Sequence, residues 1–133
     1  MEGRFSSPNL GGFDRFSFEP TRVDKPWGWE LLWAHAPDYV GKVLFVEAGK
    51  ALSLQFHRVK DESWYVQTGR VELQLGEPGQ AVLDSQIVGA GACFRFRPGT
   101  VHRVRALEDT TILEVSTPHL EDVVRLEDDY GRA

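Results

Sequence analysis

From Val43 onward the sequence is a series of short β-favouring runs, and turn residues separate one run from the next. The runs read "VLFVEA", "LSLQFH", "SWYVQT", "VELQLG", "AVLDSQIVG", "CFRFR", "VHRVRA" and "TILEVS", with glycines or Pro-Gly pairs between most of them. Regular short strands with glycine turns are typical of antiparallel sandwiches and barrels. We therefore predict an all-β fold, with "KPWGWELLWA" as one or two further strands and "TPHLEDVVRLEDDYG" as a short helical or irregular C-terminal tail.

The length of the chain, 133 residues, suits one domain with a real core and is too short for two. Residues 1–20 are rich in Gly, Ser and Phe without a steady period. We expect them to form a partly ordered N-terminal arm. Residues 21–133 then form a single domain.

The charge and the cysteine content limit which partners and which cellular compartment we expect for this protein. The net charge of -5 argues against nucleic acid and against an anionic membrane as the main partner. Apolar runs are short and the N-terminus lacks an apolar stretch, so we predict no membrane span and no signal peptide. The single cysteine, Cys93, excludes an internal disulfide and fits a cytoplasmic protein. Its strand-like surroundings predict a buried structural thiol.

Gln55, His57, Glu62 and His102 have the chemistry of metal ligands. Gln55 and His57 are two apart in a predicted strand and therefore share a face. Glu62 opens the next run, which a hairpin would return beside His57, and His102 follows the turn "RPGT" into a strand that could cross the same space. Such a nitrogen and oxygen set suits zinc first, then manganese, iron(II), nickel or cobalt, and it leaves positions open for substrate. A metal-free, sugar-binding barrel is the alternative.

The residues around these candidate ligands resemble two known motifs. The pattern G-x5-Q-x-H-x4-E-x6-G over residues 49–69 resembles the first cupin motif, with Gln55 at its first histidine position. The segment "GACFRFRPGTVH" resembles the second motif with His102 in register, although Arg97 stands at the usual proline position and Ala106 at the usual asparagine position. The resemblance implies the cupin jelly-roll barrel, a double-stranded β-helix with a metal in its lumen.

A narrower resemblance covers most of the chain, from about Lys25 to Arg132. "KPWGWE", "KALSLQFHRVKDESWYVQTGRVELQLG", "PGTVHRV" and "EDVVRLEDDYGR" are similar to the cupin part of type II phosphomannose isomerases. The resemblance implies that the metal ligands are Gln55, His57, Glu62 and His102. "QFHRVKDESW" departs from the family's His-rich "QxHHHRxEHW", which bears on substrate preference, and the family's nucleotidyltransferase part has no counterpart in this sequence.

Phosphomannose isomerases interconvert an aldose phosphate and a ketose phosphate through a cis-enediol, so the resemblance implies a metal-dependent sugar isomerase active in carbohydrate metabolism. Because Glu62 would bind the metal, another group must move the proton. Glu127, Asp129 and Lys60 are the candidates.

The substrate would be a small sugar or sugar phosphate, and a phosphate requires cations. Arg103 and Arg132 lie in the matched motifs and are the preferred pair, with Lys25 as a further candidate. The tryptophans either pack in the core or form a wall on which a sugar ring stacks, with Trp64 as the candidate.

Two other functions compete with the isomerase. One is a non-catalytic cupin that binds a metal, sugar or metabolite as a sensor or accessory protein, and the other is an iron-dependent cupin dioxygenase.

The sequence also predicts a homodimer. If Gln55 and His57 face the lumen, then Leu52, Leu54 and Phe56 form an apolar row on the outer face that a second subunit would cover.

Overall fold

The computed structural model describes residues 16–133, which form β-strands and connecting loops without a helix. The strands are β1 (Thr21–Lys25), β2 (Gly28–Ala36), β3 (Tyr39–Val46), β4 (Leu54–Phe56), β5 (Glu62–Thr68), β6 (Arg70–Gly76), β7 (Asp84–Gly89), β8 (Cys93–Phe96), β9 (Val101–Ala106), β10 (Thr110–Ser116) and β11 (Val124–Glu127). Residues 1–15 of the predicted N-terminal arm lie outside the described residues.

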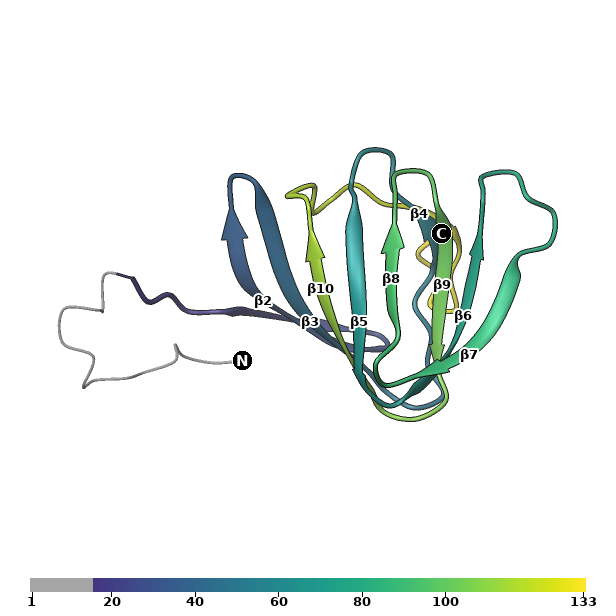
Figure 1. Ribbon diagram of the computed structural model, residues 1–133, viewed down its shortest axis with the longest axis horizontal. Helices are drawn as coiled ribbons and strands as arrows, with labels where there is room; N and C mark the ends of the chain where they lie inside the picture. The colour runs from purple at the N-terminus through teal and green to yellow at the C-terminus, as the bar shows by residue number, and fades with distance from the viewer. Residues whose placement is uncertain (1–15) are drawn as a thin grey trace.

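The strands form two antiparallel sheets that enclose the core (Figure 1). The six-stranded sheet has the order β1-β2-β3-β10-β5-β8, and the five-stranded sheet has the order β11-β4-β9-β6-β7. The chain changes sheets repeatedly, as in a jelly roll. The predicted all-β double-stranded β-helix is therefore confirmed.

Two details of the connections differ from the sequence-based expectation. The hairpin expected between β4 and Glu62 does not form, because β4 pairs with β9 and β11 whereas β5 pairs with β8 and β10. Residues 57–61 instead carry the chain from one sheet to the other. The C-terminal tail was predicted to be helical or irregular, and it is irregular. It also adds the short strand β11 at the edge of the sheet beside β4.

Alternation along the strands separates the core from the surface. In β5, Glu62, Trp64 and Val66 are buried, whereas Tyr65 and Gln67 are exposed. A tight turn at Gly69, which has a φ of 95°, then reverses the chain into β6. A Cβ atom here would lie 2.5 Å from the carbonyl oxygen of Asp109, so the turn requires glycine.

Inward-facing side chains change from apolar to polar within several strands. In β3 the buried Val46 and Leu44 are followed by the buried Lys42, and in β10 Ile112 is followed by Glu114. The apolar core therefore fills one end of the barrel and leaves a polar end. Its members come from both sheets and are Trp27, Leu44, Val46, Leu52, Trp64, Val71, Leu73, Phe96, Val104, Ala106 and Ile112.

The apolar row on which the predicted dimer rests is not continuous on the outer face. Leu52 precedes β4 and belongs to the core, with 8% of its surface exposed. Leu54 and Phe56 are half-buried, and the Arg58 guanidinium lies 5.8 Å from the centre of the Phe56 ring. The homodimer stays a prediction, but this row no longer supports it.

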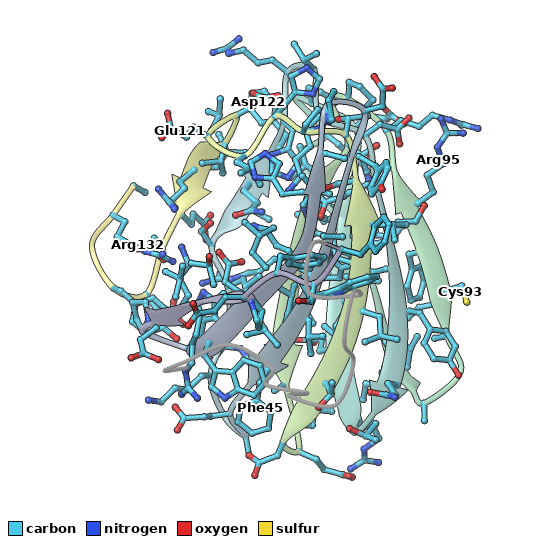
Figure 2. The ribbon with its side chains drawn as sticks, turned by 90° about the vertical axis from the view of Figure 1, so that its left-hand side faces the viewer. Phe45, Cys93, Arg95, Glu121, Asp122 and Arg132 are labelled. Carbon is cyan, nitrogen blue, oxygen red and sulfur yellow. The ribbon has the colours of Figure 1, made fainter. Side chains whose placement is uncertain are left out.

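Cys93 is exposed, so the prediction of a buried thiol was wrong (Figure 2). It begins β8, the edge strand of the six-stranded sheet, opposite the exposed Tyr65 of β5. Alternation had correctly placed Cys93 in a strand, but it could not show which side faced solvent.

Within residues 16–133, no helix is long and apolar enough to span a membrane.

Candidate metal centre

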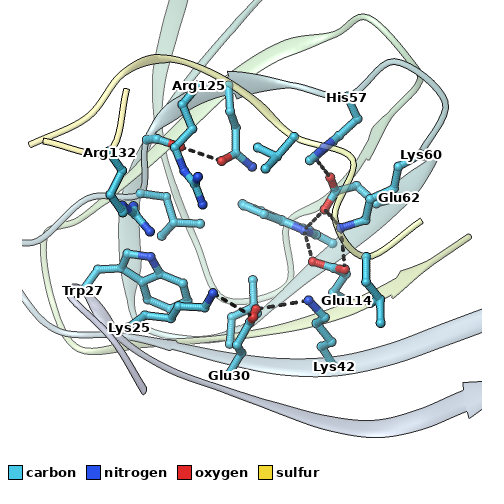
Figure 3. Close-up of a pocket in the computed structure, with 17 residues that line it drawn as sticks. Lys25, Trp27, Glu30, Lys42, His57, Lys60, Glu62, Glu114, Arg125 and Arg132 are labelled. Atoms are coloured by element: carbon cyan, nitrogen blue, oxygen red, sulfur yellow. Dashed lines mark hydrogen bonds and ion pairs between the residues drawn. The ribbon is translucent and has the colours of Figure 1, made fainter. Parts of the chain in front are cut away.

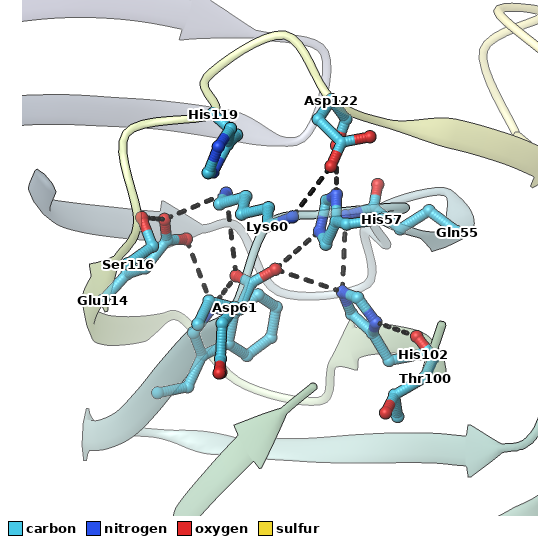
Figure 4. Close-up of polar contacts among 12 residues, drawn as sticks. Gln55, His57, Lys60, Asp61, Thr100, His102, Glu114, Ser116, His119 and Asp122 are labelled. Atoms are coloured by element: carbon cyan, nitrogen blue, oxygen red, sulfur yellow. Dashed lines mark hydrogen bonds and ion pairs between the residues drawn. The ribbon is translucent and has the colours of Figure 1, made fainter. Parts of the chain in front are cut away.

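Three side chains from separate parts of the chain meet at the polar end of the barrel (Figure 4). His57 follows β4, Glu62 begins β5, and His102 lies in β9. Their closest ligand atoms all lie within 4.8 Å of one another. Oε2 of Glu62 is 2.5 Å from Nε2 of His57 and 3.7 Å from Nε2 of His102. All three residues are buried, so they form a compact donor set that could hold a metal ion.

Backbone carbonyl groups orient both imidazole rings. Nδ1 of His57 donates to the carbonyl oxygen of Asp122, and Nδ1 of His102 donates to that of Thr100 at 3.0 Å. Because a carbonyl oxygen only accepts, these contacts assign the proton of each neutral ring to Nδ1. Nε2 of each ring then carries the lone pair that a metal requires from histidine.

Two atoms of the set lack hydrogen-bond partners. Nε2 of His57 and Oε2 of Glu62 are buried and find no hydrogen-bond donor among residues 16–133. With the His57 proton on Nδ1, both atoms are acceptors, although they lie only 2.5 Å apart. A positive centre between two such acceptors, a proton or a metal cation, would stabilise them. The donor set therefore fits a divalent metal ion.

The protonation states of two of these residues agree with metal binding. Burial alone would raise the pKa of Glu62, but a proton shared with Nε2 of His57 and the positive charge of Lys60 lower it to about 2. Burial lowers the pKa of His102 to about 4, although the charge of Glu62 opposes this shift. At neutral pH, Glu62 is therefore a carboxylate and His102 a neutral imidazole. These are the forms in which the two side chains bind metals.

Gln55, the fourth predicted ligand, lies beside this set. The Ser53 hydroxyl donates to Oε1 of Gln55 at 2.6 Å, and Nε2 of Gln55 lies 3.5 Å from Nε2 of His102. Arg125, Gln55 and His102 are direct neighbours across β11, β4 and β9. The structure thus brings the four predicted ligands together, with the Gln55 oxygen engaged by Ser53.

A second buried network lies against Glu62 (Figure 4). Nζ of Lys60 is 3.9 Å from Glu62 and 3.2 Å from Glu114, and Nε1 of Trp64 donates to both carboxylates, at 2.7 and 3.2 Å. Burial raises the pKa of Glu114, and the charge of Glu62 raises it further. Burial alone would lower the pKa of Lys60, but the two carboxylates raise it. Lys60 is therefore a buried ammonium ion at neutral pH.

These groups line one side of a pocket of about 90 Å³, which we call the central pocket (Figure 3). Across the pocket from His57 lie cations from the first strand and the tail, which we call the cationic wall: Lys25, Arg125 and Arg132.

The cations of the pocket are only partly neutralised. Glu30 contacts Lys25 at 3.4 Å and Lys42 at 3.2 Å, and Arg132 pairs with Asp128 at 2.9 Å. In contrast, Nε of Arg125 is buried and has no hydrogen-bond partner in the described part of the chain. The wall therefore retains donor capacity that an anionic ligand could use.

The other predicted site residues divide into two groups. Lys25, Lys60, Trp64 and Arg132 line the central pocket, but Trp64 is buried behind the carboxylates and offers little ring surface to a sugar.

The second group does not line the pocket. Arg103 pairs with Asp129 at 2.7 Å and with Glu127 at 3.6 Å, and Arg105 binds Asp129 at 3.1 Å. Since His102 points into the barrel, its neighbour Arg103 points out of it. The structure therefore does not bring Arg103, Glu127 or Asp129 to the metal centre.

Among the pocket residues that were not predicted from the sequence are three buried or half-buried charged ones, namely Glu30, Lys42 and Glu114. Each is a charged residue on the inward-facing side of its strand. In β10, for example, Glu114 follows Ile112 with the strand period of two. A charge on a core-facing position was the signal available, because buried charges require partners or a function.

The family model described as "Cupin domain" matches residues 42–116, which is more than half of the chain. Together with the jelly-roll barrel and its polar lumen, this match shows that the protein belongs to the cupin family.

Among curated proteins, two xanthan biosynthesis proteins XanB from strains of Xanthomonas campestris pv. campestris are similar to this chain. They are 31% and 30% identical over 114 residues, which covers 84% of this chain. The chain spans only 24% of the length of these relatives.

Solved structures share the fold at lower sequence identity. KdgF from Halomonas sp. has a TM-score of 0.64 at 24% identity, covering 74% of this chain and 88% of its own. The capsular polysaccharide assembling protein CapF from Staphylococcus aureus has a TM-score of 0.69 at 18% identity, with 84% of this chain and 35% of its own covered. Oxalate decarboxylase from Bacillus subtilis scores 0.69 at 16% identity, with coverages of 81% and 30%. These similarities show the fold alone.

Proposed function

We propose that this cupin is a metal-dependent sugar isomerase that interconverts an aldose phosphate and a ketose phosphate, in the manner of mannose-6-phosphate isomerases. One observation carries the proposal. The donor set of His57, Glu62 and His102 and the cationic wall lie on different sides of one pocket. A sugar phosphate has a carbonyl group that a metal can polarise and a phosphate that cations can bind, so it matches both sides.

His57, Glu62 and His102 would hold the metal, with Gln55 as the fourth ligand. A divalent metal bound there would supply Lewis-acid polarisation of the sugar carbonyl, which makes the neighbouring C–H group more acidic. The Lys60 ammonium, which also lines the pocket, would stabilise negative charge that develops on the sugar oxygens as the proton leaves.

Glu114 and Lys60 are our proposed proton-transfer pair. Isomerisation moves one proton between neighbouring carbons, which a single group can remove and return, and a second proton between the two attached oxygens, which the other group can carry. Glu114 lines the pocket 3.2 Å from Lys60, and burial raises its pKa above that of an ordinary carboxyl group. Glu127 and Asp129 do not enter this proposal, because their contacts are with Arg103 and Arg105.

The phosphate would bind to the cationic wall. Arg125 offers a buried Nε without a hydrogen-bond partner in residues 16–133, and Arg132 and Lys25 lie beside it in the pocket lining. Guanidinium groups bind phosphate with two parallel hydrogen bonds, which fixes the orientation of the sugar. The relatives named for xanthan biosynthesis agree with a carbohydrate substrate.

The test is to load the protein with zinc, manganese, cobalt or nickel and to follow mannose 6-phosphate, mannose and lyxose by NMR. Formation of the corresponding ketose with at least one metal supports the proposal, and Glu114→Gln should then abolish turnover while metal binding remains. If all three sugars stay unchanged, the isomerase proposal fails. Metal or sugar binding without turnover would indicate a non-catalytic cupin, and oxygen uptake with iron(II) would indicate a dioxygenase.

A further inference from the structure

Residues 117–123 of the tail lie along the loop that carries His57. Thr117 and Asp61 form two hydrogen bonds: the backbone N–H of Thr117 donates to the carbonyl of Asp61 at 3.0 Å, and the N–H of Asp61 donates to Oγ1 of Thr117 at 3.1 Å. The same tail segment supplies Leu120 and Val123 to the lining of the central pocket. The loop and the tail segment are therefore joined side by side at the metal centre.

Asp122 makes the most contacts between the two segments (Figure 4). Its carboxylate accepts hydrogen bonds from the backbone N–H groups of Arg58, Val59 and Lys60, at 3.1, 2.7 and 2.8 Å. These three residues directly follow His57. Burial alone would raise the pKa of Asp122, but these three donors lower it to about 2, so the carboxylate is ionised at neutral pH.

The backbone carbonyl of the same residue accepts the Nδ1 proton of His57. The side chain of Asp122 thus fixes the loop after His57, and its main chain fixes the His57 ring. If the carboxylate were removed, the tail would lose three of its contacts to the loop. The carbonyl would then no longer be held opposite Nδ1, and the ring could rotate or exchange its proton between nitrogens.

We propose that Asp122 is a positioning residue that holds His57 with its proton on Nδ1 and its Nε2 lone pair directed at the metal position. This proposal rests on the proposed metal site for its functional meaning. Groups that orient a metal ligand typically change metal affinity by about 10- to 100-fold when they are removed. We therefore expect a loss of this size in Asp122→Ala.

The matched control is Asp109→Ala. Asp109 also accepts a hydrogen bond from a loop N–H, that of Ala48 at 2.9 Å, but it has no contact with the proposed ligands. Both substitutions therefore remove a loop-capping carboxylate. Asp122→Asn keeps one side-chain acceptor oxygen and should fall between the wild type and Asp122→Ala.

The first measurement is the dissociation constant for cobalt(II), with the visible absorption of the bound ion as a report of its coordination. Asp122→Ala should bind cobalt about 10- to 100-fold more weakly and with an altered spectrum, whereas Asp109→Ala should match the wild type. An unchanged constant and spectrum in Asp122→Ala would overturn the proposal. A folding defect in Asp122→Ala would show as lost cooperativity in thermal unfolding. In that case the cobalt affinity and spectrum of Asp122→Asn are compared with those of the wild type instead.

The second measurement needs no metal. Long-range 1H–15N NMR spectra of the metal-free protein report which imidazole nitrogen of His57 carries the proton. The wild type and Asp109→Ala should show the Nδ1–H form, and the Asp122 variants should show a mixture of forms. If the Nδ1–H form persists in Asp122→Ala, Asp122 does not position the ring. Failure of the wild type to bind any metal would instead count against the proposed function, and the NMR result would still decide the role of Asp122.

Discussion

The two sides of the central pocket are built in different ways. On the metal side, His57, Glu62 and His102 are buried and both imidazole rings are fixed by backbone carbonyls. On the cationic wall, Arg132 is held by a carboxylate of its own tail, and Nε of Arg125 has no hydrogen-bond partner among the described residues. The metal side thus holds its rings in place and leaves acceptor atoms for a cation, whereas the cationic wall leaves donor atoms for an anion.

This difference suggests a division of tasks. A metal ion tolerates little error in the position of its ligands, so preorganisation by the surrounding protein increases affinity. A phosphate group accepts many hydrogen bonds from several directions, so a set of cations from β1 and the tail can serve it. The following predictions test whether the two sides are separable in this way.

The largest effect is expected from removing both histidines. The double variant His57→Ala/His102→Ala leaves only Gln55 and Glu62 of the four proposed ligands, so bound metal should fall from one equivalent to none, as measured by elemental analysis of the purified protein. The control is His119→Ala, which removes an exposed histidine and should keep the full equivalent. Stoichiometric metal in the double variant would show that the site is elsewhere.

The next effect concerns the cationic wall. Arg125→Ala should weaken the binding of a sugar phosphate by about 10- to 100-fold, because a charged hydrogen-bond donor contributes about 1.5–3 kcal/mol. Metal content should not change. Isothermal titration with the sugar phosphate measures the first quantity, and Arg95→Ala, which removes an exposed arginine paired with Asp61, is the control. A matching loss of metal would show that the two sides are not separable.

The metal side should also determine the acid sensitivity of the metal-free protein. The pKa of His102 is about 4 in the fold against an ordinary value of 6.5, so between these values the unfolded chain binds one more proton than the folded chain. The free energy of unfolding should therefore fall as the pH decreases from 6.5 toward 4, by up to about 1.4 kcal/mol per pH unit. Denaturant titrations across this range measure the slope.

His102→Gln should flatten that slope, and His119→Gln should leave it as in the wild type. A slope that survives in His102→Gln would assign the acid sensitivity to another group. Glu62 does not contribute to this slope above its ordinary pKa of 4.5, because it is ionised there in the unfolded chain and also in the fold, where its pKa is about 2.

The smallest effect is expected outside the pocket. Glu127→Ala and Asp129→Ala remove exposed partners of Arg103 and Arg105, so each should change the free energy of unfolding by less than about 1 kcal/mol. Metal content and sugar turnover should equal those of the wild type in assays run beside the Arg125 variant. A strong loss of turnover in either variant would restore these acids as catalytic candidates.

The metal side could be predicted from the sequence because strand periodicity determines which residues share a face. Once Gln55 and His57 are placed in the lumen, the register between β4 and β9 sets His102 opposite Gln55. The same reasoning excludes Arg103 from the lumen, since it is adjacent to His102 in a strand. That exclusion was available from the sequence, but the matched motif favoured Arg103 instead.

The cationic wall could be predicted only in part, because it depends on how distant segments come together. Arg132 and Lys25 were found through the family resemblance, but Glu30, Lys42 and Glu114 enter the pocket through pairing of β2, β3 and β10. Period-two alternation identifies two faces of a strand and does not show which one is inside. Leu52 illustrates this limit: this residue, two positions before β4, turns into the core rather than outward.

The buried indole of Trp64 gives the metal centre an optical signal of its own. Its N–H is shared between Glu62 and Glu114, and its ring lies 5.8 Å from His102 in an edge-on arrangement. The emission of an indole responds to nearby charge, and charge at Glu62 changes whenever a cation arrives or departs. Tryptophan fluorescence should therefore report occupancy of this site in the unmodified protein, without any attached dye.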